Sequence, residues 1–448
     1  MKTLKVILFL SFLFFAGSAQ ARVSLISDEE TELFLQRLIR PIFNAAGIPF
    51  NRDYIYIVND DSLNAFVGDE NRLFINTGTI IKSDSKDELA GVIAHEAGHI
   101  LGGHILRLKI KSQEMSKMSL ASMLMAGAAV AASGRGDVGM AVLLGSQSSL
   151  LSHFTAYRVQ EERSADNSAI KLLAQVERSP EGMRDFMRKV RYQNELSGRE
   201  ETPYFRTHPV TTERITFMEE AVKNSRVAPS NENEDDFLRV KAKLIGYLYD
   251  PQKVFNIYPE SDKSVPARYA RSIANFRRLK IRQAMTELNE LIELEPNNPF
   301  FYELKGQIFF ESGKMRQAKI NYRKALDLLP NSELFKQNLA HATLEDNPNM
   351  KDLRDVTDIL KRSLIRSDNA YSWLMLSKAY GKMNDMANSN YAAAEYSYRL
   401  GENEVSLRQA KEALKHGPNQ VVELKLNDLI ARLEELKANS LSQPHRRR

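Results

Sequence analysis

The fold of the first half of the chain is decided by residues 85–103, which read SKDELAGVIAHEAGHILGG. Ser85 and Glu88 have the spacing of a capping box, and apolar residues follow at helical intervals. We therefore predict a helix through this stretch. Each glycine inside a helix costs about 1 kcal/mol relative to alanine, so the glycines here indicate close packing or a bend. They are Gly91, Gly98, Gly102 and Gly103.

Within this helix lies the pattern His-Glu-x-x-His, at residues 95–99. Residues four apart share a helix face, so His95 and His99 can offer imidazole nitrogens to one zinc ion about 2 Å away. Glu96 lies beside them, where it can take a proton from a zinc-bound water whose pKa the metal lowers to near 7. The pattern predicts one zinc ion per chain and peptide hydrolysis with Glu96 as general base. The alternative is an exposed helix with two ordinary histidines.

Catalytic zinc needs a third protein ligand, and the residues leave several sources open. His104 comes one residue too early to continue the pattern as a metzincin would. His153 and His208 are two further histidines. Glu162 and Asp166 lie four apart on one helix face, where one can bind the metal and the other can orient an imidazole. Without other information, a surface acidic cluster explains this last pair equally well.

A family resemblance narrows the choice of the third zinc ligand. The H-E-x-x-H motif is followed by E-x-x-x-D at residues 162–166, which begins 162 − 99 = 63 residues after His99. An Asn-Ala-Phe segment at 64–66 precedes the helix, and a Thr-His-Pro segment at 207–209 follows. This arrangement resembles the gluzincin family that includes the CAAX prenyl proteases, and it implies an α+β zincin-like fold.

The resemblance implies that Glu162 joins His95 and His99 as the zinc ligands. Asp166 matches the family aspartate that is sometimes assigned as a proton donor. We interpret it instead as an acceptor that orients a ligand imidazole. Spacing on a helix does not by itself exclude Glu161 as the ligand.

Two further segments take their expected roles from the resemblance. It places His208 near the zinc, where we expect either a reversible fourth ligand or a group that stabilises the transition state. Pro209 biases His208 towards an extended conformation, and a surface-loop histidine is the alternative. Residues 64–66 are expected on an edge strand that pairs with the substrate backbone.

The sequence around the motif predicts a mostly helical protease domain with a small antiparallel sheet. An amphipathic helix is expected from Ser27, and strands are expected at 54–58 and 72–76. Residues 120–144 are nearly all apolar or small but too short to span a bilayer. We interpret them as a buried helical hairpin, and the alternative is a surface for peripheral contact with a membrane or a partner.

The second half predicts an all-α solenoid of tetratricopeptide repeats. Pro296 and Pro330 are 330 − 296 = 34 residues apart, which is the length of one such repeat. Weaker copies at 269–296, 373–396 and 398–418 bring the expected number to about four. Such repeats bind proteins.

The ends of the chain suggest export. Residues 1–21 have the charged start, apolar run and small-residue end of a signal peptide that is cleaved after Ala21. The chain has no cysteine, which excludes thiolate zinc sites and suits a bacterial periplasm. The expected domains are a signal peptide (1–21), a protease (22–228), an acidic linker with a connecting helix (229–264), repeats (265–437) and a disordered basic tail (438–448).

The net charge argues against one class of function, and the family resemblance implies another. Removing the signal peptide lowers the formal charge from +5 to +3, and no basic stripe indicates nucleic-acid binding. The resemblance implies a periplasmic endopeptidase that degrades misfolded or stalled outer-membrane proteins, with the repeats binding clients or the beta-barrel assembly machinery. The alternative is a mainly non-proteolytic chaperone or adaptor with a structural zinc, although such a site needs no Glu96.

Overall fold

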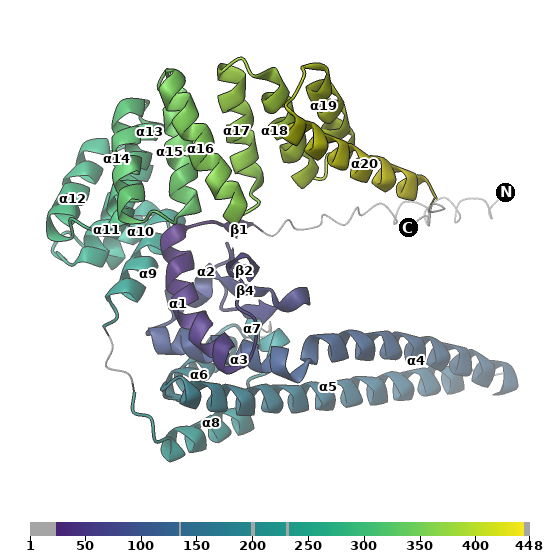
Figure 1. Ribbon diagram of the computed structural model, residues 1–448. Helices are drawn as coiled ribbons and strands as arrows, with labels where there is room; N and C mark the ends of the chain where they lie inside the picture. Colours follow the sequence, from purple (N-terminus) through teal and green to yellow (C-terminus); the bar gives the residue numbers. More distant parts are fainter. Residues whose placement is uncertain (1–23, 134–135, 199–201, 230–232, 443–448) are drawn as a thin grey trace, which may run out of the picture. The chain divides into compact units, whose positions relative to one another are not determined.

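The computed structural model describes residues 24–133, 136–198, 202–229 and 233–442, so the expected signal peptide and most of the basic tail lie outside it. The chain forms two compact units. Among the described residues, unit 1 holds 24–27 and those from Thr31 to Phe237, and unit 2 holds Asp28–Glu30 and those from Leu238 to Ser442. Figure 1 shows the elements of both units. No described helix is long and apolar enough to cross a membrane.

Unit 1 contains a four-stranded sheet in the order β1-β2-β4-β3. Both expected strands form, but the expectation of an antiparallel sheet was wrong because β2 and β4 pair in parallel. The segment between them forms β3, which pairs antiparallel with β4 and leaves β3 at the edge of the sheet. The strands are β1 (Leu25–Ile26), β2 (Ile55–Val58), β3 (Ala65–Val67) and β4 (Leu73–Asn76).

The central helix of unit 1 is α3 (Lys86–Gly102), which carries the His-Glu-x-x-His pattern. Ser85 caps it by accepting a hydrogen bond from the backbone N–H of Glu88, as the sequence predicts. The glycines allow close packing: a Cβ on Gly98 would lie 2.6 Å from the carbonyl oxygen of Ala165. Gly103 has φ 62°, a conformation that favours glycine, and it ends the helix.

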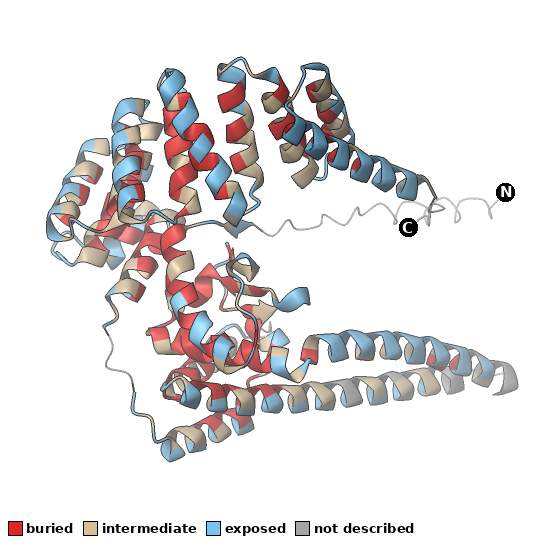
Figure 2. Ribbon diagram, viewed as in Figure 1, coloured by how far each residue is buried: buried red, intermediate tan, exposed pale blue. Residues whose placement is uncertain are grey.

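A long helical hairpin follows, made of α4 (His104–Ser133) and α5 (Gly136–Gln175) (Figure 1). The expected hairpin forms, but the expectation that residues 120–144 are buried was wrong. Large apolar side chains there are exposed, among them Leu120 at 61%, Leu124 at 69% and Leu144 at 59%. Figure 2 shows that most of the hairpin is coloured as exposed or intermediate. In unit 1, α5 lies along α3 only towards its C-terminal end.

The other helices of unit 1 surround this core. The helix expected from Ser27 forms as α1, whose Phe34, Leu35 and Ile39 are buried. The sheet leads through α2 into α3, and α6 packs against α3 and α8. These helices are α1 (Glu29–Ala45), α2 (Thr77–Lys82), α6 (Glu181–Leu196), α7 (Pro203–Thr207) and α8 (Thr212–Asn224), with short 3-10 turns at Arg52–Tyr54 and Asp69–Asn71.

Unit 2 begins with two helices before the repeats. These are α9 (Asp235–Leu248) and α10 (Pro251–Ile257). Lys243 of α9 is buried with its Nζ atom 2.5 Å from a carboxylate oxygen of Asp28 and 3.9 Å from one of Glu303. Glu30 accepts hydrogen bonds from Arg239 and from the Tyr269 hydroxyl, so the start of α1 is part of this unit.

The rest of unit 2 consists of five helix pairs. Successive pairs begin at Val265, Pro299 and Glu333, which are 34 residues apart, so the expected repeat fold is confirmed. The number exceeds the expected four because the pair that begins at Glu333 packs through Phe335, Leu339 and Ala342, without the tyrosine and glycine of its neighbour. The pairs are α11 (Val265–Arg277) and α12 (Ile281–Leu294), α13 (Pro299–Glu311) and α14 (Met315–Leu328), α15 (Glu333–Glu345) and α16 (Met350–Arg366), α17 (Ala370–Lys382) and α18 (Met386–Arg399), and α19 (Asn403–Lys415) and α20 (Gln420–Ser442).

Candidate active site

Four side chains from three places in the chain converge at the centre of unit 1. They are His95 and His99 on α3, Glu162 on α5 and His208 in the loop before α8, and all four are buried. One possible ligand atom from each lies within 4.8 Å of all the others. The structure thus brings together the expected ligand set. His104 and Glu161 are not members of this cluster, and the His153 side chain lies outside the described part of the chain.

The spacing of these atoms fits a tetrahedral zinc ion. Zinc with ligands at about 2.0–2.1 Å separates those ligands from one another by about 3.3 Å. His95 Nε2 lies 3.1 Å from His99 Nε2 and 3.2 Å from Glu162 Oε2. His208 Nδ1 lies 3.3 Å from His95 Nε2 and 3.1 Å from Glu162 Oε1. Three imidazoles and one carboxylate also form the nitrogen and oxygen donor set that zinc accepts.

Asp166 and Arg214 hold the outer side of His95. Asp166 Oδ1 lies 2.9 Å from His95 Nδ1, the ring nitrogen that faces away from the cluster. Arg214 donates two hydrogen bonds of 2.7 Å to Asp166 and one of 2.8 Å to the carbonyl of Pro209, and its Nη1 lies 2.9 Å from Glu162. Arg214 thus connects Glu162 and Asp166 of α5 with the His208 loop.

The charges of this cluster shift the pKa values of its acids. Burial alone would raise the pKa of Asp166, but the charge of Arg214 and its hydrogen bonds hold that pKa below its ordinary value. Burial acts in the same direction on Glu162, and the His208 charge and hydrogen bonds outweigh it, so its pKa is also lowered. Both acids are therefore ionised at neutral pH.

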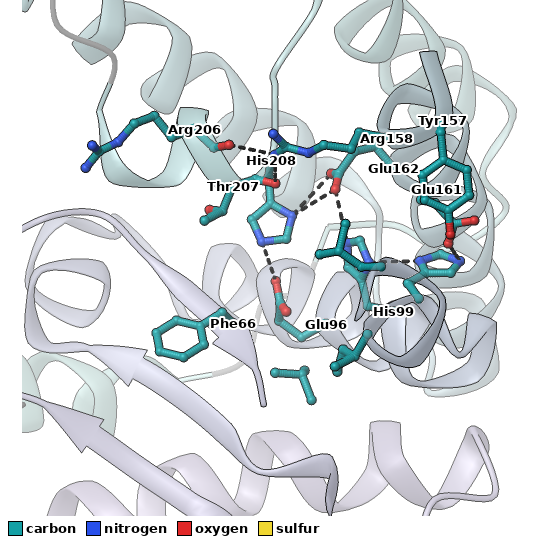
Figure 3. A pocket seen from close by; sticks show the side chains of 14 residues that line it. Phe66, Glu96, His99, Tyr157, Arg158, Glu161, Glu162, Arg206, Thr207 and His208 are labelled. Atoms are coloured by element: carbon teal, nitrogen blue, oxygen red, sulfur yellow. Dashed lines mark hydrogen bonds and ion pairs between the residues drawn. The ribbon is translucent and has the colours of Figure 1, made fainter. Parts of the chain in front are cut away.

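Glu96 has a different environment from these two acids. It is 1% exposed, and burial raises its pKa although His208 and His95 oppose the rise. Its Oε1 atom lies 3.5 Å from His208 Nε2. Figure 3 shows the two side chains facing each other. The His208 ring therefore contacts the ligand cluster through one nitrogen and the candidate base through the other.

The His208 loop is fixed by an arginine from the hairpin. Arg158 of α5 donates hydrogen bonds of 2.6 Å to the carbonyls of Arg206 and Thr207 (Figure 3). The buried ring of Tyr204 lies 4.9 Å from the His208 ring, centre to centre. The sequence did not single out Arg158, Arg214 or Tyr204 as functional, because none of them belongs to a short pattern with fixed spacing.

A cleft of about 420 Å³ opens beside the cluster. The edge strand β3 contributes Phe66 and Val67 to one wall, and the base of the hairpin contributes Ile105, Leu108 and Tyr157. Glu96, His99 and His208 also line it (Figure 3). The cleft thus has mostly apolar walls, a polar cluster and a strand edge that can pair with an extended peptide.

Buried histidines of a His-Glu-x-x-His helix, a glutamate from a second helix and an adjacent carboxylate define a zinc metallopeptidase. Residues 29–222 match the family model of peptidase family M48.

Two relatives that are proteases support the same class, and one solved structure aligns with part of the chain. The chain is 25% identical over 361 residues to the beta-barrel assembly-enhancing protease of Escherichia coli (strain K12), covering 79% of this chain and 72% of the relative. It is 28% identical over 228 residues to a protease HtpX homolog of Paraburkholderia phytofirmans, covering 44% and 78%. A thermophilic TPR protein of Thermus thermophilus aligns with 38% of this chain and all of its own at 13% identity and a TM-score of 0.25.

Proposed function

We propose that this protein is a periplasmic zinc-dependent endopeptidase that cleaves misfolded or stalled outer-membrane proteins. The main support is that His95, His99 and Glu162 converge beside Glu96, in a cleft bounded by the edge strand β3. A free strand edge pairs with peptide backbone of almost any sequence, but only where that backbone is extended and unpaired. Unfolded chains meet this condition and folded barrels do not.

The proposed roles follow from the contacts. His95, His99 and Glu162 would hold one zinc ion, which when bound supplies Lewis acidity to the scissile carbonyl and to water. Glu96 accepts a proton from the attacking water and passes it to the leaving amine. Asp166 Oδ1 lies 2.9 Å from His95 Nδ1, and we assign this carboxylate to orient the imidazole so that Nε2 is directed at the metal. We assign orientation, and not proton donation, to Asp166 because Arg214 already occupies both of its oxygens.

His208 is proposed as a reversible fourth ligand that keeps the enzyme inactive at rest. Its Nδ1 lies at ligand spacing from His95 and Glu162, and its Nε2 is near Glu96. One imidazole thereby takes the place that water needs and contacts the base as well. Substrate entry along β3 would have to displace the loop that Arg158 holds.

The proposed periplasmic location and protein partners rest on the relatives and on the surfaces of the helices. The curated relatives named beta-barrel assembly-enhancing protease favour an envelope role. The helix pairs of unit 2 are proposed to bind clients or the beta-barrel assembly machinery. The exposed apolar side chains of α4 and α5, including Leu120, Leu124 and Leu144, support peripheral contact of the hairpin with a membrane.

The proposal is tested with purified wild-type protein and the Glu96→Gln variant, each loaded with zinc and incubated with an unfolded outer-membrane protein. We expect equal zinc content and a cleavage rate at least about 10²-fold lower for the variant. Equal cleavage by both proteins would exclude Glu96 as the base. A wild-type protein that prevents aggregation of the client without cleaving it would favour the chaperone alternative.

A further inference from the structure

The outer nitrogen of His99 contacts a residue that the proposed function does not use. His104 is 4% exposed, and its Nδ1 lies 2.9 Å from Nδ1 of His99. The two rings stand almost at right angles, with centres 4.9 Å apart. His99 faces the ligand cluster through Nε2, so His104 occupies the same position relative to His99 that Asp166 occupies relative to His95.

The end of α3 is built to bring His104 to this place. Gly103 ends the helix in a left-handed conformation, and α4 begins at once with His104, so the chain turns back towards His99. Gly102 leaves the room that the ring occupies, because a Cβ there would overlap Nε2 of His104. The paired glycines thus permit a contact that an uninterrupted helix could not make, since residues five apart lie on different faces.

The far side of His104 is held by charged groups of the hairpin. Its Nε2 lies 2.9 Å from Oε2 of Glu161. Arg107 donates hydrogen bonds of 2.9 and 3.1 Å to the two oxygens of Glu161. The guanidinium fixes the carboxylate, whose negative charge faces this ring nitrogen.

A single arrangement of protons satisfies all these contacts. Zinc binding through Nε2 of His99 requires the proton of that ring on Nδ1. This proton can be donated to Nδ1 of His104, which then carries its own proton on Nε2, opposite the carboxylate of Glu161. We propose that His104 is a positioning residue that accepts the Nδ1 proton of His99 and directs its Nε2 at the zinc, with Glu161 and Arg107 fixing the His104 tautomer. This inference rests on the proposed zinc site.

Substitutions can separate the hydrogen-bond acceptor of His104 from the packing of its ring. The side-chain oxygen of asparagine reaches the position of the imidazole Nδ1, so His104→Asn retains an acceptor for His99. His104→Phe keeps a ring but has no acceptor. Gly102→Ala leaves His104 unchanged chemically but forces its ring away from the present position. Losing an outer partner of a metal ligand weakens metal binding by roughly 10–100-fold.

The experiment measures zinc affinity of the full chain by competition with a chromogenic chelator, and the visible spectrum of the cobalt-substituted protein. Unfolding of the metal-free protein is followed alongside as a measure of stability. We expect His104→Phe and Gly102→Ala to bind zinc roughly 10–100-fold more weakly than wild type and to change the cobalt spectrum. His104→Asn should stay within a few-fold of wild type.

Failure of the proposed role of His104 and failure of the proposed zinc site give different results. A wild-type protein that binds no zinc would overturn the proposed function. Wild-type affinity in both Gly102→Ala and His104→Phe would overturn only the role of His104. His104→Asn and His104→Phe could also lose zinc affinity equally, in proportion to the lower stability of their metal-free forms. That result would show that His104 acts only through packing of the fold, and it would also overturn the proposed role of His104. If His104→Phe does not fold, the comparison of Gly102→Ala with His104→Asn decides the matter.

Discussion

The close approach of α3 and α5 at Gly98 predicts that Gly98→Ala weakens metal binding as well as the fold. The added Cβ would lie 2.6 Å from the carbonyl oxygen of Ala165, and real Cβ atoms do not come closer than 3.0 Å to such an atom. The helices must therefore separate by at least 3.0 − 2.6 = 0.4 Å. Ala165 is adjacent to Asp166 and three residues from Glu162, so the displacement moves both candidate site residues.

The expected magnitudes follow from two opposing effects. Alanine is favoured over glycine in a helix by about 1 kcal/mol. Overpacking of a close contact costs about 1–3 kcal/mol. The free energy of unfolding should thus fall by no more than about 2 kcal/mol. This minimum displacement of 0.4 Å already approaches the limit of about 0.5 Å within which a functional cluster must be held, so we expect zinc affinity to fall by roughly tenfold.

Gly91→Ala provides a matched control on the same helix. Its Cβ would lie 2.7 Å from the Cα of Met183, on α6, which carries none of the candidate ligands. Both variants thus gain the same helix preference and suffer a similar clash. The assay is zinc competition with a chelator, combined with denaturant unfolding of the metal-free chain. If Gly91→Ala lowers zinc affinity as much as Gly98→Ala, or if neither variant lowers it, the reasoning from the α3–α5 contact is refuted.

Two further predictions concern His208 and the repeat unit. His208→Ala should raise the basal cleavage rate at equal zinc content, because the imidazole no longer takes the place of water; a lower rate at equal zinc would indicate a catalytic role instead. Burial raises the pKa of Glu303 to about 7, against the opposing charge of Lys243, so its protonated form stabilises the fold. That stability is fully present below the unfolded pKa of about 4.5 and is lost as pH rises through 7. Unfolding followed by fluorescence of Trp373, the only tryptophan, should show lower stability at pH 8 than at pH 5, and a smaller difference in Glu303→Gln.

The motif helix was predictable because every signal for it is local. The capping serine, the helical spacing and the His-Glu-x-x-His pattern lie within residues 85–103, and the helix forms there. The glycines also indicated close packing or a bend, and the structure has both, at Gly98 and Gly103. Such features depend on neighbours in sequence and need no knowledge of the tertiary fold.

The errors concern relations between distant residues. Whether two strands run parallel depends on where the segment between them pairs, and nothing in Ile55–Val58 or Leu73–Asn76 states this. The apolar composition of residues 120–144 indicates burial only if something covers the hairpin, and the side chains described there are largely exposed. Arg214 reaches Asp166 across 48 residues, so no local pattern indicates the contact.

The length of α5 links the site to a distant part of unit 1. This helix runs from Gly136 to Gln175, which at 1.5 Å per residue is about 60 Å, and Glu162, Asp166 and Arg158 all lie on it. A displacement of the N-terminal end of α5 would therefore also move Glu162, a candidate metal ligand, and Arg158, which holds the His208 loop. Because α5 is one continuous helix, the positions of Glu162 and of the His208 loop depend on the position of the whole hairpin.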